Sequence, residues 1–331
     1  MNVYKEKGVV GLKAVTPGET KLHSTAKKKR GFWATFKEQK VLYGMSIPFI
    51  IVVFIFSYMP VWGWLMAFQN YRPGKGILEQ KWVGFDHFVA LFSDEKFYQV
   101  MRNTLAMSFM GLIVGFTVPI LFAVLLNEIR GSVFKRTVQT ISYLPHFVSW
   151  VVVAGIVTKM LAVEGGAVNQ LLMGLGFTDS PISFMSKGSW FWTIVTSAEL
   201  WKTMGWNAII YLAAITGIDQ EQFEAAKVDG ANRIRQIWHI TLPSIAPTVA
   251  ILLIMSIGHL ISIGFEKQFL LGNPLVVDYS EVLDLYALNY GLGMGRFSFG
   301  TAIGMFNSLV SILLLLLANG AFKKFAKQSI M

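Results

Sequence analysis

The stretch NTLAMSFMGLIVGFTVPILFAVLL, residues 103–126, decides the fold class. It carries no charged side chain, and a helix of this length matches the hydrocarbon core of a bilayer, about 30 Å thick. Five further stretches are long and mainly apolar, namely residues 43–68, 138–161, 190–215, 244–265 and 301–322. The sequence therefore predicts an all-α, polytopic membrane protein with six transmembrane helices.

The composition of the whole chain of 331 residues supports a membrane protein. Hydrophobic side chains make up 54% of it and charged ones 15%, whereas soluble domains have about 45–50% and 25%. A net charge of +10 would suggest a nucleic-acid partner for a soluble chain. Membrane proteins, however, gather Lys and Arg on their cytoplasmic side, so no nucleic-acid partner is expected. The absence of cysteine excludes disulfides, thiolate metal sites and cysteine nucleophiles.

The distribution of Lys and Arg predicts the orientation of the chain. Ten of these 29 residues lie in residues 1–42, and three lie in each of the segments 127–137, 216–243 and 323–331. The loops on the other side carry eight in total. By the positive-inside tendency, both termini and the loop 216–243 are expected in the cytoplasm.

The sequence predicts two regions, a polar N-terminal tail and a transmembrane domain. Residues 1–42 form a polar tail in which the cations Lys27–Arg30 precede a segment with three aromatic residues, up to Lys37. The tail segment is typical of a helix on the inner leaflet, or of a basic cluster that only sets topology. Residues 43–331 are expected to form one transmembrane domain. Between its first two spans, residues 82–92 predict an amphipathic helix on the outer surface, with Asp86 as N-cap.

The loop 216–243 carries the most informative polar sequence. Its residues 219–230, DQEQFEAAKVDG, predict a short helix that begins at a capping box and ends at Gly230 in the left-handed conformation. Residues 231–240 predict a second helix, which we expect to end near Leu242 and Pro243.

The first of these two helices presents small and acidic residues together. Paired alanines at 225 and 226 let another surface approach the backbone closely, and Glu224 and Asp229 offer negative charge to a basic partner. From the residues alone, two interpretations stay open: a surface that docks a partner, or an amphipathic hairpin that rests on the membrane.

A family resemblance decides between them. The residues Glu224-Ala225-Ala226, Asp229-Gly230-Ala231 and Ile240-Thr241-Leu242-Pro243 resemble, in type and spacing, the EAA motif of ABC importer permeases. Residues 40–331 are similar to this family as a whole. The stretch 84–104 resembles the segment before span two in its sugar-transporting members. The stretch 127–147 resembles their polysaccharide and oligosaccharide branch, which includes aldouronate-type uptake systems.

The resemblance implies a type I importer permease (MetI-like) fold in a bacterial cytoplasmic membrane. It also implies a second, homologous but non-identical permease subunit, two cytoplasmic ATPases, an extracytoplasmic solute-binding protein and a carbohydrate substrate. In this family the EAA loop couples the permease to the ATPase. The implied coupling residues are Glu224, Ala225, Ala226, Asp229, Gly230, Leu242 and Pro243.

The sequence contains no phosphate-binding Gly-x-x-x-x-Gly-Lys-Ser/Thr loop. ATP and Mg²⁺ are therefore expected on the separate ATPase, and no cofactor is expected in this chain. Five histidines without metal-ligand spacing predict no metal site.

Charged residues within the span 190–215 need a partner or a water-filled cavity. Glu199 and Lys202 are spaced to pair with each other along a helix. The alternative is that they line a solute path, because the same span combines aromatic and hydrogen-bonding side chains that suit a sugar. The candidate path residues are Glu199, Trp201, Lys202, Trp206, Asn207, Tyr211, Ser256, His259, Ser262 and Asn307. Gly111, Gly115 and Pro119 predict close helix packing and a kink.

A membrane-embedded enzyme is the rival hypothesis, with Glu199 and His259 as acid and base. Only one carboxylate, that of Glu199, lies well inside a predicted span. An enzyme also has no use for the charged loop 216–243, so we predict a transporter subunit rather than an enzyme.

Overall fold

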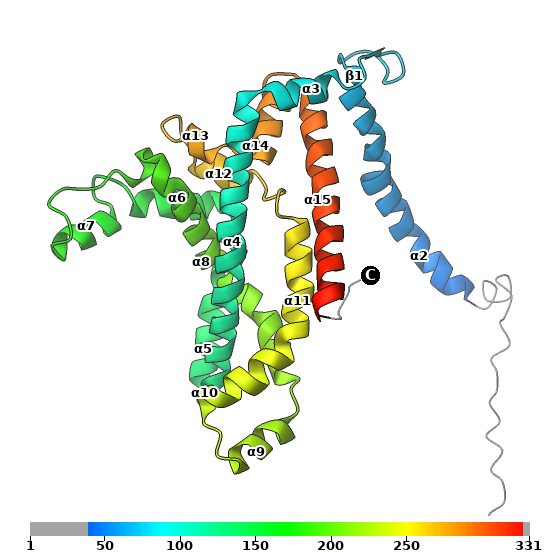
Figure 1. The fold of residues 1–331 in the computed structure, drawn as a ribbon. Coiled ribbons are helices and arrows are strands. Elements are labelled where there is room, and N and C mark those ends of the chain that lie inside the picture. The colour runs from blue at the N-terminus through cyan, green and yellow to red at the C-terminus, as the bar shows by residue number, and fades with distance from the viewer. Residues whose placement is uncertain (1–38, 327–331) are drawn as a thin grey trace, which may run out of the picture. The chain divides into compact units, whose positions relative to one another are not determined.

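The computed structural model describes residues 39–326, which are mostly helical (Figure 1). The exception is a small antiparallel pair of strands, β1 (Gln69–Asn70) and β2 (Lys81–Trp82), in which Gln69 lies opposite Trp82. The predicted all-α class is therefore right except for this hairpin.

Two compact units divide the chain, Met1–Pro60 and Val61–Met331. The described part of the first unit contains α2 (Lys40–Val53) and the π-helical η1 (Phe54–Tyr58). With η2 (Met59–Phe68), they form a helical stretch long and apolar enough to cross a membrane. This agrees with the predicted span 43–68. The predicted interfacial segment at residues 27–37 lies outside the described residues.

Two long helices of the second unit correspond to predicted spans. Helix α4 (Glu95–Glu128) contains the span 103–126, and α15 (Phe297–Ala326) contains the span 301–322. Helix α4 begins at Asp94, whose carboxylate accepts a hydrogen bond from the Lys96 backbone N–H, as an N-cap residue does.

The predicted span 138–161 is not one straight helix. Its residues form α5 (Ser132–Tyr143), the 3-10 helix η3 (Leu144–Phe147) and α6 (Trp150–Met160), with a bend of 103°. Pro145 has no N–H to continue the helical ladder, and Ser149 starts a new helix by accepting a hydrogen bond from the Val152 N–H. The prediction of an unbroken span was wrong because these two local signals were overlooked.

Helix α8 (Gly188–Thr216) covers the predicted span 190–215 but is less apolar than a typical span. Among residues 39–326, four helices are long and apolar enough to cross a membrane, or five if the bent α5–α6 pair is one span. The count of six transmembrane helices therefore stays a prediction.

The second helix of the loop 216–243 does not end at Pro243, which contradicts the sequence prediction. Helical structure continues from α10 (Arg233–Gln236) through the π-helical η5 (Ile237–Thr241) into α11 (Leu242–Gly258). The π turn, closed by the Leu242 N–H and the Ile237 carbonyl, widens the backbone where the ring of Pro243 would otherwise meet the preceding turn. Helix α11 also ends earlier than the predicted residue 265.

The remaining helices are short. They are α3 (Asp86–Ser93), α7 (Ala167–Gly174), η4 (Phe184–Ser186), α9 (Gln220–Val228), α12 (Glu266–Leu271), α13 (Val277–Ser280), α14 (Leu283–Leu288) and η6 (Asn289–Gly293). The expected amphipathic helix near residue 86 is confirmed as α3, but Phe85 occupies its N-cap position and Asp86 is its first helical residue.

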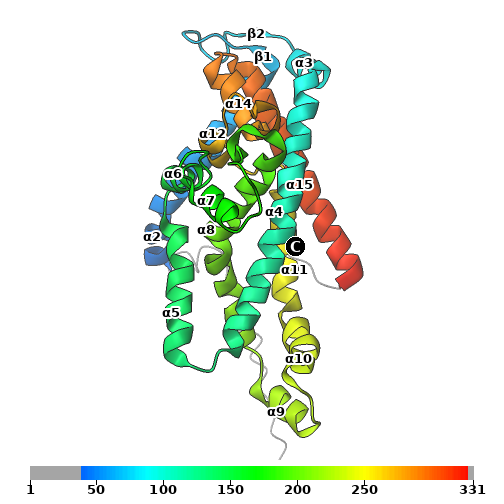
Figure 2. The same cartoon turned by 90° about the vertical axis from the view of Figure 1, so that its left-hand side faces the viewer.

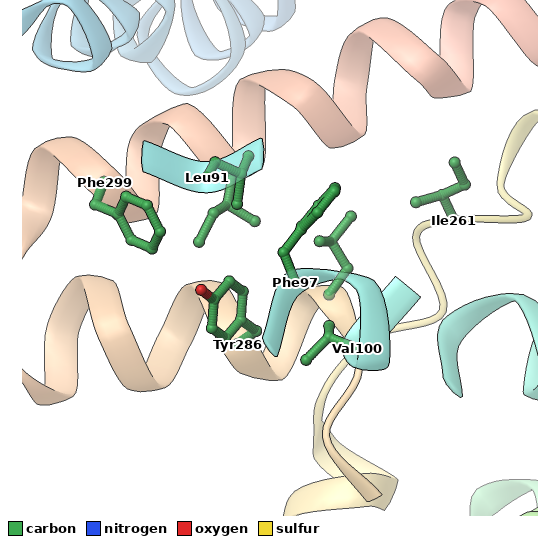
Figure 3. Packing of buried hydrophobic residues seen from close by; sticks show 8 residues of the cluster. Leu91, Phe97, Val100, Ile261, Tyr286 and Phe299 are labelled. Atoms are coloured by element: carbon green, nitrogen blue, oxygen red, sulfur yellow. The ribbon is translucent and has the colours of Figure 1, made fainter. Parts of the chain in front are cut away.

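Within the second unit, α4 packs along α8, and α11 packs along α15 (Figures 1 and 2). Where α3, α4, α14 and α15 meet, a buried cluster includes Leu91, Phe97, Tyr286 and Phe299 (Figure 3). Ile261, from the non-helical residues 259–265 after α11, belongs to the same cluster. Hydrophobic packing therefore holds a non-helical segment against the helices.

The contact between α5 and α8 depends on Gly205. A Cβ atom at this position would overlap the carbonyl oxygen of Ser142 on α5. A glycine therefore permits the two backbones to approach closely beside the bend.

We predict that Gly205→Ala destabilises the purified permease by about 1–3 kcal/mol, because the added methyl group forces α5 away from α8. Gly304→Ala on α15 is the control, since a Cβ there meets no atom within 4 Å. The measurement is the apparent melting temperature of both variants in detergent. Equal melting temperatures for the two variants would contradict the close α5–α8 contact.

Candidate functional site

A cavity of about 340 Å³ lies between α4, α8, α11 and the non-helical segment that follows α11. This volume is within the range of about 300–1,000 Å³ that small-molecule sites occupy. Much of its wall can form hydrogen bonds. The polar side chains are those of Ser108, Thr196, Glu199, Thr203, Asn207, Ser256, His259, Ser262 and Lys267.

The charged residues of α8 do not pair with each other, which contradicts the expected Glu199–Lys202 pair. Glu199 instead accepts from Lys267 of α12, with 2.5 Å between Oε2 and Nζ. Lys202 is buried, and its Nζ donates to the carbonyl oxygens of His146 and Val148, at 2.6 Å each. The bend between α5 and α6 leaves these carbonyls without helical partners, so the ammonium group replaces the missing N–H donors.

Other candidate path residues divide into two groups. Asn207, Ser256, His259 and Ser262 line the cavity together with Glu199, as the path hypothesis expects. Four others do not line it and are described in turn below.

Tyr211 is 3% exposed and belongs to a buried cluster of α4, α8 and α11. The ring of Trp206 stacks on His146, with 4.4 Å between the ring centroids. Trp201 lines a separate, mainly apolar pocket of about 450 Å³ beside α6 and α7. Asn307 donates to Asp284 on α14. These side chains have structural partners that the sequence did not reveal.

Sequence reasoning missed several cavity residues. Lys267 lies just beyond a predicted span. A carboxylate inside a span, such as that of Glu199, needs a cationic partner, and this requirement could have pointed to Lys267. Gly111 and Gly115 on α4 also line the cavity, and a Cβ at either position meets no atom within 4 Å. The expected close packing at these glycines is therefore wrong, because they leave open space instead.

His259 ends α11 at the cavity wall. Its Nδ1 lies 2.9 Å from the Met255 carbonyl oxygen, so a neutral ring donates there and keeps Nε2 as an acceptor. In the part of the chain that the structure describes, no group of three His, Cys, Asp or Glu residues is placed to hold a metal ion.

Helix α9 of the loop 216–243 is capped at both ends as predicted, except that the Asp219 side chain bonds to the N–H of Glu221 and not to that of Gln222, as a capping box would require. The Asp219 carboxylate accepts from the Glu221 N–H at its start. At its end Gly230 has φ +76°, and the N–H groups of Gly230 and Ala231 donate to the carbonyls of Lys227 and Ala226. These two bonds are the Schellman pattern, which requires the left-handed glycine. Between the two ends, Glu224 and Asp229 are exposed.

The loop 216–243 is joined to the cavity by an ion pair and by a continuous helical stretch. Arg233 of α10 forms an ion pair with Glu128 at the end of α4, with 3.2 Å between nitrogen and oxygen. From Arg233 the helical structure runs without a break, through Leu242 and Pro243, to the cavity residue Ser256. One continuous helical stretch therefore links the end of the loop 216–243 to the cavity wall, and the turn at residues 229–232 joins α9 to its start.

Comparison with known protein families matches residues 111–328 to the binding-protein-dependent transport system inner membrane component. The chain belongs to this family. It is 44% identical over 293 residues to the polygalacturonan/rhamnogalacturonan transport system permease protein YteP of Bacillus subtilis, which covers 88% of this chain and 91% of that protein. It is 30% identical over 321 residues to the arabinooligosaccharides transport system permease protein AraP of the same species, which covers 94% and 99%.

A solved structure supports the same assignment. The crystal structure of a bacterial ABC transporter involved in the import of the acidic polysaccharide alginate superimposes with a TM-score of 0.82 at 40% identity, covering 88% of this chain and 98% of that chain. This permease is therefore a multi-pass membrane component of an ABC transporter for sugars or polysaccharides, with a MetI-like fold. Its relatives are transport permeases, so the rival hypothesis of a membrane-embedded enzyme is rejected.

We predict that a double-mutant cycle detects energetic coupling between Glu199 and Lys267 but not between Glu199 and Lys202. Glu199→Gln and Lys267→Met should each lower the apparent melting temperature, and combining them should cost less than the sum, with a coupling of about 0.5–3 kcal/mol. Glu199→Gln with Lys202→Met is the control pair and should be additive. A coupling confined to the control pair would contradict the Glu199–Lys267 contact.

Proposed function

We propose that this permease translocates an oligosaccharide through the cavity between α4, α8 and α11. The observation that carries the proposal is the chemistry of the cavity wall. A neutralised ion pair, hydroxyl groups, an amide and an imidazole surround a space large enough for a small molecule. Sugars present many hydroxyl groups that both donate and accept, which such a wall satisfies.

Carbohydrate is the substrate class that the comparisons favour. The similar proteins are named as transporters of polygalacturonan/rhamnogalacturonan, of arabinooligosaccharides and of alginate. Glu199 is the central candidate in the cavity, because its charge is balanced by Lys267 while its side chain is 38% exposed. An exposed carboxylate of this kind accepts hydrogen bonds from sugar hydroxyls without leaving an uncompensated charge in the membrane.

The loop 216–243 is proposed as the coupling element to a separate ATPase that binds ATP and Mg²⁺. Three observations support this: the exposed acidic groups of Glu224 and Asp229, the left-handed turn at Gly230, and the continuous helix from Arg233 to Gly258. The small side chains of Ala225 and Ala226 allow the surface of the ATPase to approach the backbone of α9 closely. Leu242 and Pro243 lie inside the connecting helix and transmit its displacement.

The proposed assembly contains this permease, a homologous non-identical permease, two ATPases and an extracytoplasmic solute-binding protein. A structure of the alginate transporter, in complex with a pentasaccharide-bound periplasmic protein, superimposes with a TM-score of 0.83 at 39% identity and supports the last of these partners. Both termini and the coupling loop face the cytoplasm in this proposal, and the solute-binding protein docks on the opposite side.

We predict that Glu224→Lys abolishes solute uptake and leaves insertion of the permease intact, because the substitution reverses the charge offered to the ATPase. Glu221→Lys, in the same helix but outside the motif, is the matched control and should retain most uptake. Uptake is measured in proteoliposomes with the complete assembly and ATP inside. Normal uptake by Glu224→Lys would refute the coupling assignment.

We also predict that cavity positions of this cysteine-free chain are accessible to water. In the complete assembly, single cysteines at Asn207 and Ser256 should react with a water-soluble thiol reagent and be protected when saccharide-loaded binding protein is added. A cysteine at the buried Tyr211 is the control and should stay unreactive. Equal reactivity at all three positions, unaffected by saccharide, would remove the cavity from the solute path.

A further inference from the structure

Asp284 of α14 joins three segments that are far apart in the sequence. Its Oδ2 accepts from the backbone N–H of Gly264 at 2.7 Å, and its Oδ1 accepts from Nδ2 of Asn307 on α15 at 2.8 Å. Asp284 does not line the cavity. Gly264, however, belongs to the non-helical segment that does.

The segment of residues 259–265 lies between the end of α11 and the start of α12. It contributes His259, Ser262 and Ile263 to the cavity wall. A segment outside the helical ladder has backbone groups that need other partners, so its position depends on the contacts that its neighbours supply.

Ser108 of α4 fixes the start of this segment, because its hydroxyl donates to the carbonyl oxygen of Leu260. Two further contacts hold the rest of the segment in place. The Ile261 side chain is 3% exposed and packs in the cluster that contains Tyr286 and Phe299 (Figure 3). At Gly264 the backbone has φ +77°, a left-handed conformation, and its N–H points to Asp284. Cavity residues Ser262 and Ile263 lie between these two fixed points.

We propose that Asp284 is a positioning residue for the transport cavity, because it fixes the segment 259–265 through Gly264 and against α15 through Asn307. This inference rests on the proposed function, in which the cavity forms the solute path. Asp284 itself touches no solute in this arrangement. It acts through the placement of His259 and Ser262.

The two hydrogen bonds that Asp284 forms with Gly264 and Asn307, here called the Asp284 tie, require acceptor oxygens rather than a negative charge. Burial raises the pKa of the Asp284 carboxyl, and the bonds from Gly264 and Asn307 oppose that rise. Among the described residues, the salt bridges do not include Asp284. An asparagine at position 284 can still accept from the Gly264 N–H and can donate to Asn307 once the amide of Asn307 has turned over. Asp284→Asn is therefore a conservative variant that should keep the tie.

The test uses the complete assembly in proteoliposomes, with Ile261→Cys as the reporter of segment position. In this background Asp284→Ala removes both acceptors and leaves the Gly264 N–H unpaired. Reaction of the buried cysteine with a thiol reagent should become about tenfold faster, and solute transported per ATP hydrolysed should fall several-fold. Asp284→Asn should stay within about twofold of the parent in both measurements. Asp278→Ala, which removes an exposed carboxylate from nearby α13, is the control without effect.

Asn307→Leu is the second variant, for use if Asp284→Ala does not fold. It removes one of the two bonds and should raise the reporter reactivity about threefold. Reporter reactivity equal to that of Asp278→Ala, in both Asp284→Ala and Asn307→Leu, would overturn the positioning role. Raised reactivity with unchanged transport per ATP would instead refute the cavity as the solute path and leave the Asp284 tie supported.

Discussion

The requirement that every backbone N–H and C=O inside a helix bundle find a partner governs the architecture of this permease. Helices satisfy it by themselves, but this chain leaves the regular helical conformation at the bend between α5 and α6 and at the segment after α11. At the bend between α5 and α6, the ammonium group of Lys202 supplies donors to the carbonyls of His146 and Val148. At the segment after α11, the carboxylate of Asp284 supplies an acceptor to the N–H of Gly264. A charged side chain thus helps to stabilise each irregular segment.

These two ties explain why charged residues occur in so apolar a chain without forming a catalytic site. Lys202 and Asp284 neutralise backbone dipoles rather than each other. Glu199 and Lys267 form the one ion pair of the cavity wall among the described residues, and that pair leaves the space between α4, α8 and α11 polar and uncharged overall. A polar, neutral wall suits a hydroxyl-rich solute and admits it without an unpaired charge in the membrane.

In the proposed function, one helix joins the coupling loop to the cavity. The π turn at Ile237–Thr241 lets the helix pass Pro243 without a break, so that the segment from Arg233 to Gly258 is continuous. If Pro243 ended the helix, as its chemistry alone suggests, the loop would be joined to the membrane domain by a flexible hinge. The continuous helix is the route by which we propose that a displacement of the loop reaches Ser256 at the cavity.

The sequence by itself determined the features that depend on local chemistry. Apolar length predicted the helices α4 and α15, and the residues around Gly230 predicted the left-handed end of α9, because each of these signals lies within a short stretch of chain. The partners of Glu199, Lys202, Tyr211 and Asn307 were decided only by the tertiary structure. Each lies on a helix where several neighbours are within reach. The bend between α5 and α6 brings the carbonyls of His146 and Val148 to Lys202, and the end of α11 at Gly258 allows α12 to bring Lys267 to Glu199. Side-chain spacing along one helix cannot predict a partner that another helix brings, so the pair Glu199–Lys267 was visible only once α8 and α12 were placed side by side in space.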